Sequence, residues 1–163
     1  WKHLSHSTSA LVNFAPDLQD LNIGLTVNLL NHRNAHTGLR YADDPALAFV
    51  EIQNEDNIFW SAIQAALKQA PTYQAVLCRQ FSDSLGKQTI SPDPNHGRFS
   101  YDYQQSAKNN APIPPRTLDE LQFLYDTQVA YYQRFVEAIR ATGYKGVIVG
   151  SCWQAGSGPS HFY

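Results

Sequence analysis

Apolar positions along this chain recur with two different periods, and these predict alternating helices and strands. A helical period over residues 57–69 and another over residues 72–85 predict two helices, which Pro71 separates. A longer helix is predicted from the capping box that begins at Thr117 to Gly143, a residue well placed to end it. The apolar stripe of this long helix comprises Leu121, Leu124, Val129, Tyr132, Phe135, Val136 and Ile139.

Residues 16–32 fit both periods. One set of leucines has helical spacing and follows Pro16, a favourable helix start; it comprises Leu18, Leu21, Leu25 and Leu29. Another set alternates as a strand would; it comprises Leu21, Ile23, Leu25, Val27 and Leu29. Gly24 would weaken a helix by about 1 kcal/mol. The length of the segment nevertheless favours a helix.

Two short apolar runs predict strands, at residues 47–54 and 147–149. The first follows a turn at residues 34–38 and a break at residues 43–45, and its composition predicts a strand buried on both faces. Strand, helices and strand in this order are typical of a parallel α/β protein. Two strands are too few for a complete sheet.

Residues 89–116 form a long proline-rich segment without clear periodicity. Segments of this kind in a compact domain are usually functional or disordered. Two interpretations stay open: a lid that folds over a site, or a surface loop that takes no part in one. Arg98, Phe99, Tyr101 and Tyr103 are its candidate ligand contacts.

Composition limits the class of protein. A chain of 163 residues with 43% hydrophobic and 16% charged residues fits one globular domain. The net charge of −2 gives no electrostatic reason to expect nucleic acid or an anionic membrane as a partner, and no apolar run approaches the length of a membrane span. The absence of methionine indicates a processed chain or part of a longer one. Cys78 and Cys152 are predicted to be two buried free thiols rather than a disulfide.

The run Gln53-Asn54-Glu55-Asp56, at the end of the first predicted strand, carries the main candidate chemistry. On a regular strand, Glu51, Gln53 and Glu55 would share a face. Glu55 would then lie at the carboxyl end of the strand, where an apolar surround would favour its protonated form. The Glu55 carboxyl could then supply a proton to a leaving group. Asn54 could hydrogen-bond a substrate hydroxyl. The alternative is an exposed helix-capping segment without catalytic function.

The stretch from Asn34 to Glu55 resembles a known family. Asn34-Ala35-His36-Thr37-Gly38, then Asp44-Pro45, precede a strand that ends in Asn54-Glu55, as before strand four of retaining glycoside hydrolases of the family 5-like, cellulase-like clan. Residues 77–83 and 139–151 resemble the following helix and the approach to strand five. The resemblance covers most of the chain from about Pro16 onward and is specific for the clan, not for the substrate.

The fold that this resemblance implies is a (β/α)8 TIM barrel. Residues 1–163 would be a single segment from the middle of the catalytic domain, because a whole barrel takes about 250 residues. Loops that lead into strands lie on the structural face of such barrels, and the chemistry lies at the opposite end. The structural face would therefore hold His32, His36, Arg40, Asp43 and Asp44. The catalytic face would hold residues 55–60 and 151–163.

The same resemblance implies a role for individual residues. Glu55 matches the general acid/base, and Asn54 matches the residue that contacts the sugar 2-hydroxyl. Trp153 lies where an aromatic platform for a sugar ring is expected. His161, Tyr101 and Tyr103 are further expected substrate contacts. The nucleophile, a glutamate at the end of strand seven, has no match and is expected outside this chain.

The implied activity is retaining hydrolysis of a β-linked polysaccharide, with β-1,4-glucan or mannan favoured. No cofactor or metal is expected, and the expected partners are a polysaccharide or oligosaccharide substrate and the remainder of the barrel. A secreted or periplasmic location is favoured by the resemblance, and the chain alone is expected to be inactive. The alternative is a non-catalytic carbohydrate-binding or structural barrel protein. A metal-dependent hydrolase would use the pairs His3/His6 or His32/His36, which lack an obvious third ligand.

Overall fold

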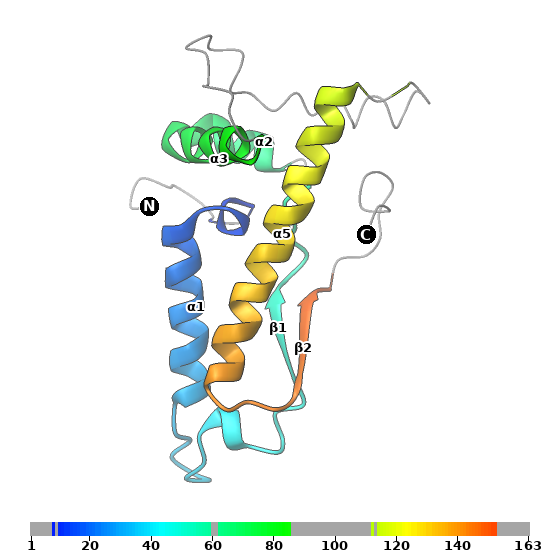
Figure 1. Cartoon of the computed structure of the whole chain (residues 1–163). Helices are drawn as coiled ribbons and strands as arrows, with labels where there is room; N and C mark the ends of the chain where they lie inside the picture. The colour runs from blue at the N-terminus through cyan, green and yellow to red at the C-terminus, as the bar shows by residue number, and fades with distance from the viewer. Residues whose placement is uncertain (1–7, 9, 60–61, 86–111, 113, 153–163) are drawn as a thin grey trace.

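The computed structural model describes residues 8, 10–59, 62–85, 112 and 114–152. Over these residues the chain is a mixed α/β protein with four α-helices and two parallel strands in a small open sheet (Figure 1). In chain order the elements are η1 (Leu11–Asn13), α1 (Pro16–Asn31), η2 (Tyr41–Asp43), β1 (Phe49–Gln53), α2 (Ala62–Gln69), α3 (Pro71–Ser84), α5 (Pro115–Ala141) and β2 (Val147–Ser151).

β1 and β2 are hydrogen-bonded neighbours, although the described helices α2, α3 and α5 lie between them in the sequence. Their register pairs Phe49 with Val147 and Gln53 with Ser151. Both strands therefore end at the same edge of the sheet. The predicted parallel α/β arrangement is confirmed, and the described residues form an open pair of strands rather than a closed barrel.

α1 and α5 lie side by side and run in the direction opposite to the strands (Figure 1). α5 lies between α1 and the sheet, while α2 and α3 lie beyond the carboxyl ends of the strands. A Cβ added at Gly150 would lie only 3.1 Å from the Tyr132 ring, so a side chain on β2 would press against α5 at this point. The sheet and the helix thus pack closely where the strand carries no side chain.

The core is built mainly on one face of α5. Leu124, Tyr131, Phe135 and Ile139 recur at helical spacing and are each at most 1% exposed. Burying a large apolar side chain contributes about 1.5–3 kcal/mol, so this stripe anchors the domain. The other largest fully buried apolar side chains are Leu11, Phe14, Ile58, Ile63 and Leu77.

The prediction of a strand buried on both faces is wrong for the described residues. Phe49 is 57% exposed and Val147 is 61% exposed, whereas Val50 and Ile148 pack against the core. The physical reason is that the described helices cover one face of the sheet. The other face carries apolar side chains that no described layer covers.

Helix positions agree with the periodic pattern more closely than helix starts do. The helix predicted over residues 16–32 is confirmed as α1, and the predicted helix over residues 72–85 is α3. The helix predicted over residues 57–69 is α2, which is described from Ala62, and residues 58–59 before it form a turn.

The long helix α5 begins two residues before the predicted capping box. Pro115 occupies its first turn, where a missing N–H costs no hydrogen bond, and no side chain caps the helix. Glu120, expected to complete the box, forms an ion pair with Arg116 at 3.5 Å. The end of the helix is as predicted, since Gly143 follows it in the left-handed region with φ of 93°.

The turn predicted at residues 34–38 is confirmed. Gly38 has φ of 70°, and Asn34 Oδ1 accepts the backbone N–H of His36 at 2.8 Å.

Both cysteines are free thiols. Cys78 is buried as predicted, but Cys152 is exposed because it lies just past the end of β2. In the described part of the chain, no helix combines the length and apolar character needed to cross a membrane.

Candidate active site

The candidate site lies at the carboxyl ends of β1 and β2. Asn54 and Glu55 follow β1, and Cys152 follows β2. Because the register pairs Gln53 with Ser151, the first residues past each strand lie beside one another. Ligands of parallel α/β proteins bind at this edge of the sheet.

Glu55 has an unusual backbone conformation. Its φ of 47° lies in the left-handed region, which costs a residue with a side chain about 1–2 kcal/mol. This turn ends the alternation of the strand, so Glu51, Gln53 and Glu55 do not continue on one face as predicted. Gln53 is buried, whereas the Glu55 side chain is exposed. The apolar surround predicted for Glu55 is therefore not formed by the described residues.

Two buried side chains on either side of Asn54-Glu55 hold the turn. Before it, Gln53 Nε2 donates to Asn13 Oδ1 at 2.9 Å. After it, Asp56 Oδ2 accepts the backbone N–H of Ala10 at 2.8 Å. Both contacts reach the segment around η1, which precedes α1. The exposed carboxyl of Glu55 thus stands on a turn that is tied to the core at both ends.

Asn13 and Gln128 extend this network into α5. Asn13 Oδ1 also accepts from Gln128 Nε2 at 3.0 Å, and Gln128 Oε1 accepts the backbone N–H of Ile58 at 2.8 Å. Asn13 Nδ2 donates to the Ala10 carbonyl at 3.0 Å. Since all these groups are buried, each hydrogen bond offsets a desolvation cost of about 1–3 kcal/mol.

Asp56 is the buried ionisable group of the network and is 6% exposed. Burial raises the pKa of Asp56, and the backbone N–H groups of Ala10 and Asn57 partly oppose this shift. Burial, with a further contribution from the Asp56 charge, raises the pKa of Tyr132 to about 12. Four buried polar atoms near the strand ends have no described hydrogen-bond partner: Gln53 Oε1, Asp56 Oδ1, the Tyr131 hydroxyl and Ser151 Oγ.

Cys152 contacts the turn from the neighbouring strand. Its thiol donates to Asn54 Oδ1 with Sγ and Oδ1 3.5 Å apart. A hydrogen bond to the Glu51 carboxylate raises the pKa of Cys152, and the backbone N–H of Glu55 partly opposes this shift. The thiol thus has two acceptors within reach, Asn54 Oδ1 and the Glu51 carboxylate, and its single S–H donates to one of them at a time.

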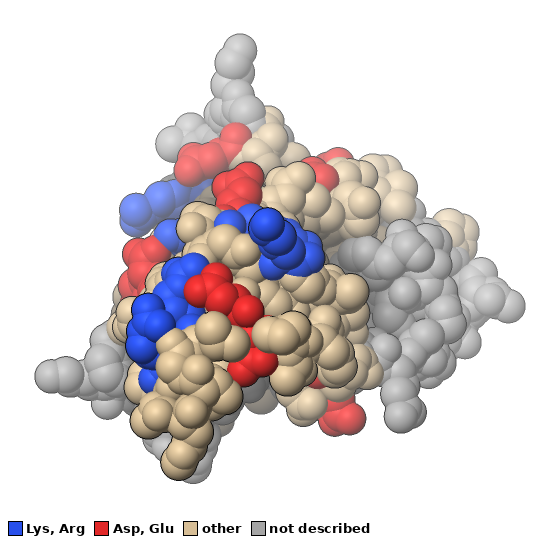
Figure 2. Space-filling model, turned by 90° about the horizontal axis from the view of Figure 1, so that it is seen from below, with Lys and Arg blue, Asp and Glu red and all other residues tan. Residues whose placement is uncertain are grey.

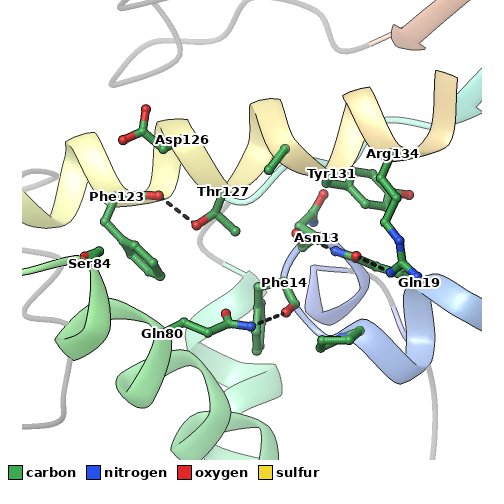
Figure 3. A pocket seen from close by; sticks show the side chains of 12 residues that line it. Asn13, Phe14, Gln19, Gln80, Ser84, Phe123, Asp126, Thr127, Tyr131 and Arg134 are labelled. Atoms are coloured by element: carbon green, nitrogen blue, oxygen red, sulfur yellow. Dashed lines mark hydrogen bonds between the residues drawn. The ribbon is translucent and has the colours of Figure 1, made fainter. Parts of the chain in front are cut away.

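A separate pocket of about 410 Å³ lies between α1, α3 and α5 (Figure 3). Its charged side chains already have partners, because Asp126 accepts from Gln122 and Arg134 donates to Gln19 and Asp20. Gln80 Nε2 donates to the Phe14 carbonyl at 3.0 Å, and its Oε1 atom has no described partner. The pocket shares Asn13 with the network but does not include Glu55.

The opposite end of the molecule carries the residues predicted for a structural face, which come before β1 in the chain. Arg40 donates to both carboxylate oxygens of Asp43 and to the Thr142 carbonyl. His32 stacks on Tyr41 with ring centroids 5.8 Å apart. Figure 2, the view of this end, shows acidic and basic side chains side by side. Among the residues that the structure describes, no cluster of three metal-ligating side chains exists.

The sequence predicts the two exposed residues of the site but not the residues that hold their turn in place. Asn54 and Glu55 lie just past the carboxyl end of β1. The described residues do not include Trp153, His161, Tyr101 and Tyr103, nor residues 89–111 and 113 of the predicted lid segment. Asn13, Gln128 and Cys152 were missed as neighbours of the turn. Gln128 gave a usable signal, because it is a polar residue on the apolar face of α5 between Leu124 and Tyr131.

Comparison with protein-family models, curated proteins and solved structures found no match to the chain. The chemistry of the site follows from its own side chains. Glu55 offers an exposed carboxyl, Asn54 offers amide donors, and Cys152 offers a thiol. Together they can transfer a proton and hydrogen-bond a hydroxyl-bearing ligand.

Proposed function

We propose that this chain is part of a retaining (β/α)8 glycoside hydrolase that acts on a β-linked polysaccharide. Glu55 is its general acid/base, and the nucleophilic carboxylate lies outside this chain. One observation carries the proposal: Glu55 stands exposed just past the carboxyl end of a parallel strand, between the buried anchors Gln53 and Asp56. A carboxyl that protonates a leaving group needs this combination of access and fixed position.

The uncovered face of the sheet supports the barrel part of this proposal. Phe49, Val147 and Val149 are exposed by 57%, 61% and 41% on the face away from α5. Parallel sheets are almost always covered on both faces. In a barrel this face turns inward against other strands, and α1 and α5 belong to the outer ring of helices. The further strands would complete the site.

In the proposed mechanism the Glu55 carboxyl protonates the glycosidic oxygen while the second carboxylate attacks the anomeric carbon. Glu55 then removes a proton from water, which releases the sugar with its original anomeric configuration. The two carboxyl groups of retaining enzymes stand about 5–5.5 Å apart. Asn54 would donate from its amide to the hydroxyl next to the anomeric carbon.

The test compares Glu55→Ala with the unchanged full-length gene product. Without its acid/base, turnover of a β-glucan or mannan should fall by about 10²–10⁴-fold. A dinitrophenyl β-glycoside releases dinitrophenolate, which departs without protonation. This substrate should therefore still form the glycosyl-enzyme, which then accumulates because no base activates water. Added azide needs no base and should restore turnover, giving a β-glycosyl azide.

Glu137→Ala is the matched control, since Glu137 is an exposed glutamate of α5. It should leave the turnover of both substrates unchanged. Equal activity of Glu55→Ala and the unchanged protein would overturn the proposal, as would an azide product of inverted configuration.

A non-catalytic sugar-binding protein is the alternative function. The observation that favours it is that the described residues form no apolar surround for the exposed Glu55 carboxyl, which a general acid would need to keep its proton. Oligosaccharide binding that Glu55→Ala leaves intact, with no turnover by the unchanged full-length protein, would select this alternative.

A further inference from the structure

The side chain of Asn54 has its two ends in different surroundings. Its Oδ1 atom accepts the thiol of Cys152, whereas no described residue accepts from its Nδ2 atom. Asn54 is exposed and lies next to Glu55. Because Asn54 Oδ1 already accepts a hydrogen bond, the N–H donors of Nδ2 are left for a ligand at the carboxyl ends of the two strands.

The contact depends on the alignment of the two strands. Gln53 pairs with Ser151 in the parallel ladder, so Asn54 and Cys152 are the next residues on adjacent strands. Glu51 on β1 faces the same thiol and favours its protonated form. An S–H donor at this place has a fixed position, because both strands are paired up to the preceding residue.

We propose that Cys152 is a positioning residue that fixes the Asn54 carboxamide with its N–H donors toward the substrate hydroxyl beside the anomeric carbon. This inference rests on the proposed glycoside hydrolase activity and adds a determinant of substrate specificity to it. The thiol takes no part in bond breaking. Its effect is confined to sugars that carry the hydroxyl which Asn54 contacts.

The first test needs no substrate and uses the ¹⁵N-labelled full chain. The side-chain amide resonances of Asn54 are assigned by their loss in Asn54→Asp, and their order parameters are measured. Cys152→Ala should lower the order of this side chain, because its acceptor loses its donor. Cys152→Ser keeps a hydroxyl donor and should preserve the order. An Asn54 side chain that is equally ordered in all three proteins would overturn the inference.

The second test measures kcat/KM of the full-length gene product on an aryl β-glycoside and on its 2-deoxy analogue. Cys152→Ala should reduce the preference for the hydroxylated substrate by about three- to tenfold, the size of one neutral hydrogen bond, and Cys152→Ser should restore it. In the Asn54→Ala background, Cys152→Ala should cause no further loss, because both changes remove one interaction.

The outcomes separate this inference from the proposed function. Equal losses on both substrates would mean that Cys152 only supports the fold, and this would overturn the inference while Glu55→Ala could still abolish turnover. Absence of turnover and of sugar binding in the unchanged protein would overturn both. In that case the order of the Asn54 side chain would still report whether Cys152 holds it.

Discussion

The backbone N–H of Ala10 donates a hydrogen bond to the Asp56 carboxylate at 2.8 Å, joining residues 46 positions apart. This contact ties the turn that carries Glu55 to the segment before α1. It is also a buried contact of an ionisable group. The stability of the fold should therefore depend on the protonation of Asp56.

Asp56→Asn should become more stable relative to the unchanged protein as the pH rises. Burial raises the pKa of Asp56 in the folded state above its ordinary value of 3.8, so the folded state binds this proton more tightly than the unfolded chain. Stability from Asp56 is then fully present below the ordinary pKa and is lost as the pH rises through the raised one. Asparagine carries no charge and escapes this loss.

Denaturant unfolding at a series of pH values from about 3 to about 7 measures the difference between the two proteins. Asp119→Asn, which removes an exposed carboxylate from α5, is the control for a general charge effect. A difference between Asp56→Asn and the unchanged protein that stays constant or shrinks with rising pH would contradict the prediction.

Asn13→Ala should destabilise the fold by about 2 kcal/mol or more. The change leaves the buried amides of Gln53 and Gln128 without their shared acceptor and the Ala10 carbonyl without its donor. Asn28→Ala, on the exposed side of α1, should stay within about 0.5 kcal/mol of the unchanged protein. Urea unfolding measures both, and similar values for the two variants would show that the network adds little.

Two glycines should respond in opposite ways to replacement by alanine. Gly143 has φ of 93° after α5, so Gly143→Ala should cost about 1–2 kcal/mol. Gly24 lies inside α1, where an added Cβ meets no atom within 4 Å, so Gly24→Ala should stabilise by about 0.5–1 kcal/mol. The midpoint of thermal unfolding should therefore fall in Gly143→Ala and rise in Gly24→Ala. Midpoints that shift in the same direction would contradict this prediction.

Arg40→Lys should destabilise the chain nearly as much as Arg40→Ala. The guanidinium of Arg40 reaches three partners at once, namely Asp43, Asn31 and the Thr142 carbonyl, and a lysine ammonium lacks this fork of donors. Arg79→Lys, at an exposed position of α3, should have no effect. Unfolding midpoints measure the three variants, and full retention of stability in Arg40→Lys would show that charge alone matters.

The sequence predicted those elements whose apolar pattern is long. α1 and α5 have enough turns for the helical period to emerge, even though Gly24 and the alternating residues of α1 also fitted a strand. Helix starts were harder to predict. The capping box at Thr117 competes with Pro115, whose fixed backbone suits the first turn, and the proline begins the helix.

Burial and the site were predicted less well, for a related reason. The apolar run of β1 indicates that both faces need covering, but a sequence does not say which segments cover them. Asn54 and Glu55 are adjacent in sequence and could be paired by inspection. Cys152 comes beside them only because two strands align, and Asn13 does so only through its contact with Gln53.

The pairing of β1 with β2 also sets a limit on how this protein folds. Partners across the ladder, such as Asn54 and Cys152, are 98 residues apart in the sequence. During synthesis β1 leaves the ribosome long before β2 exists, and closing a loop of this length is slow and entropically unfavourable. The helices can form while β1 waits unpaired. We therefore expect the edge that carries Glu55 to assemble only after β2 has been synthesised.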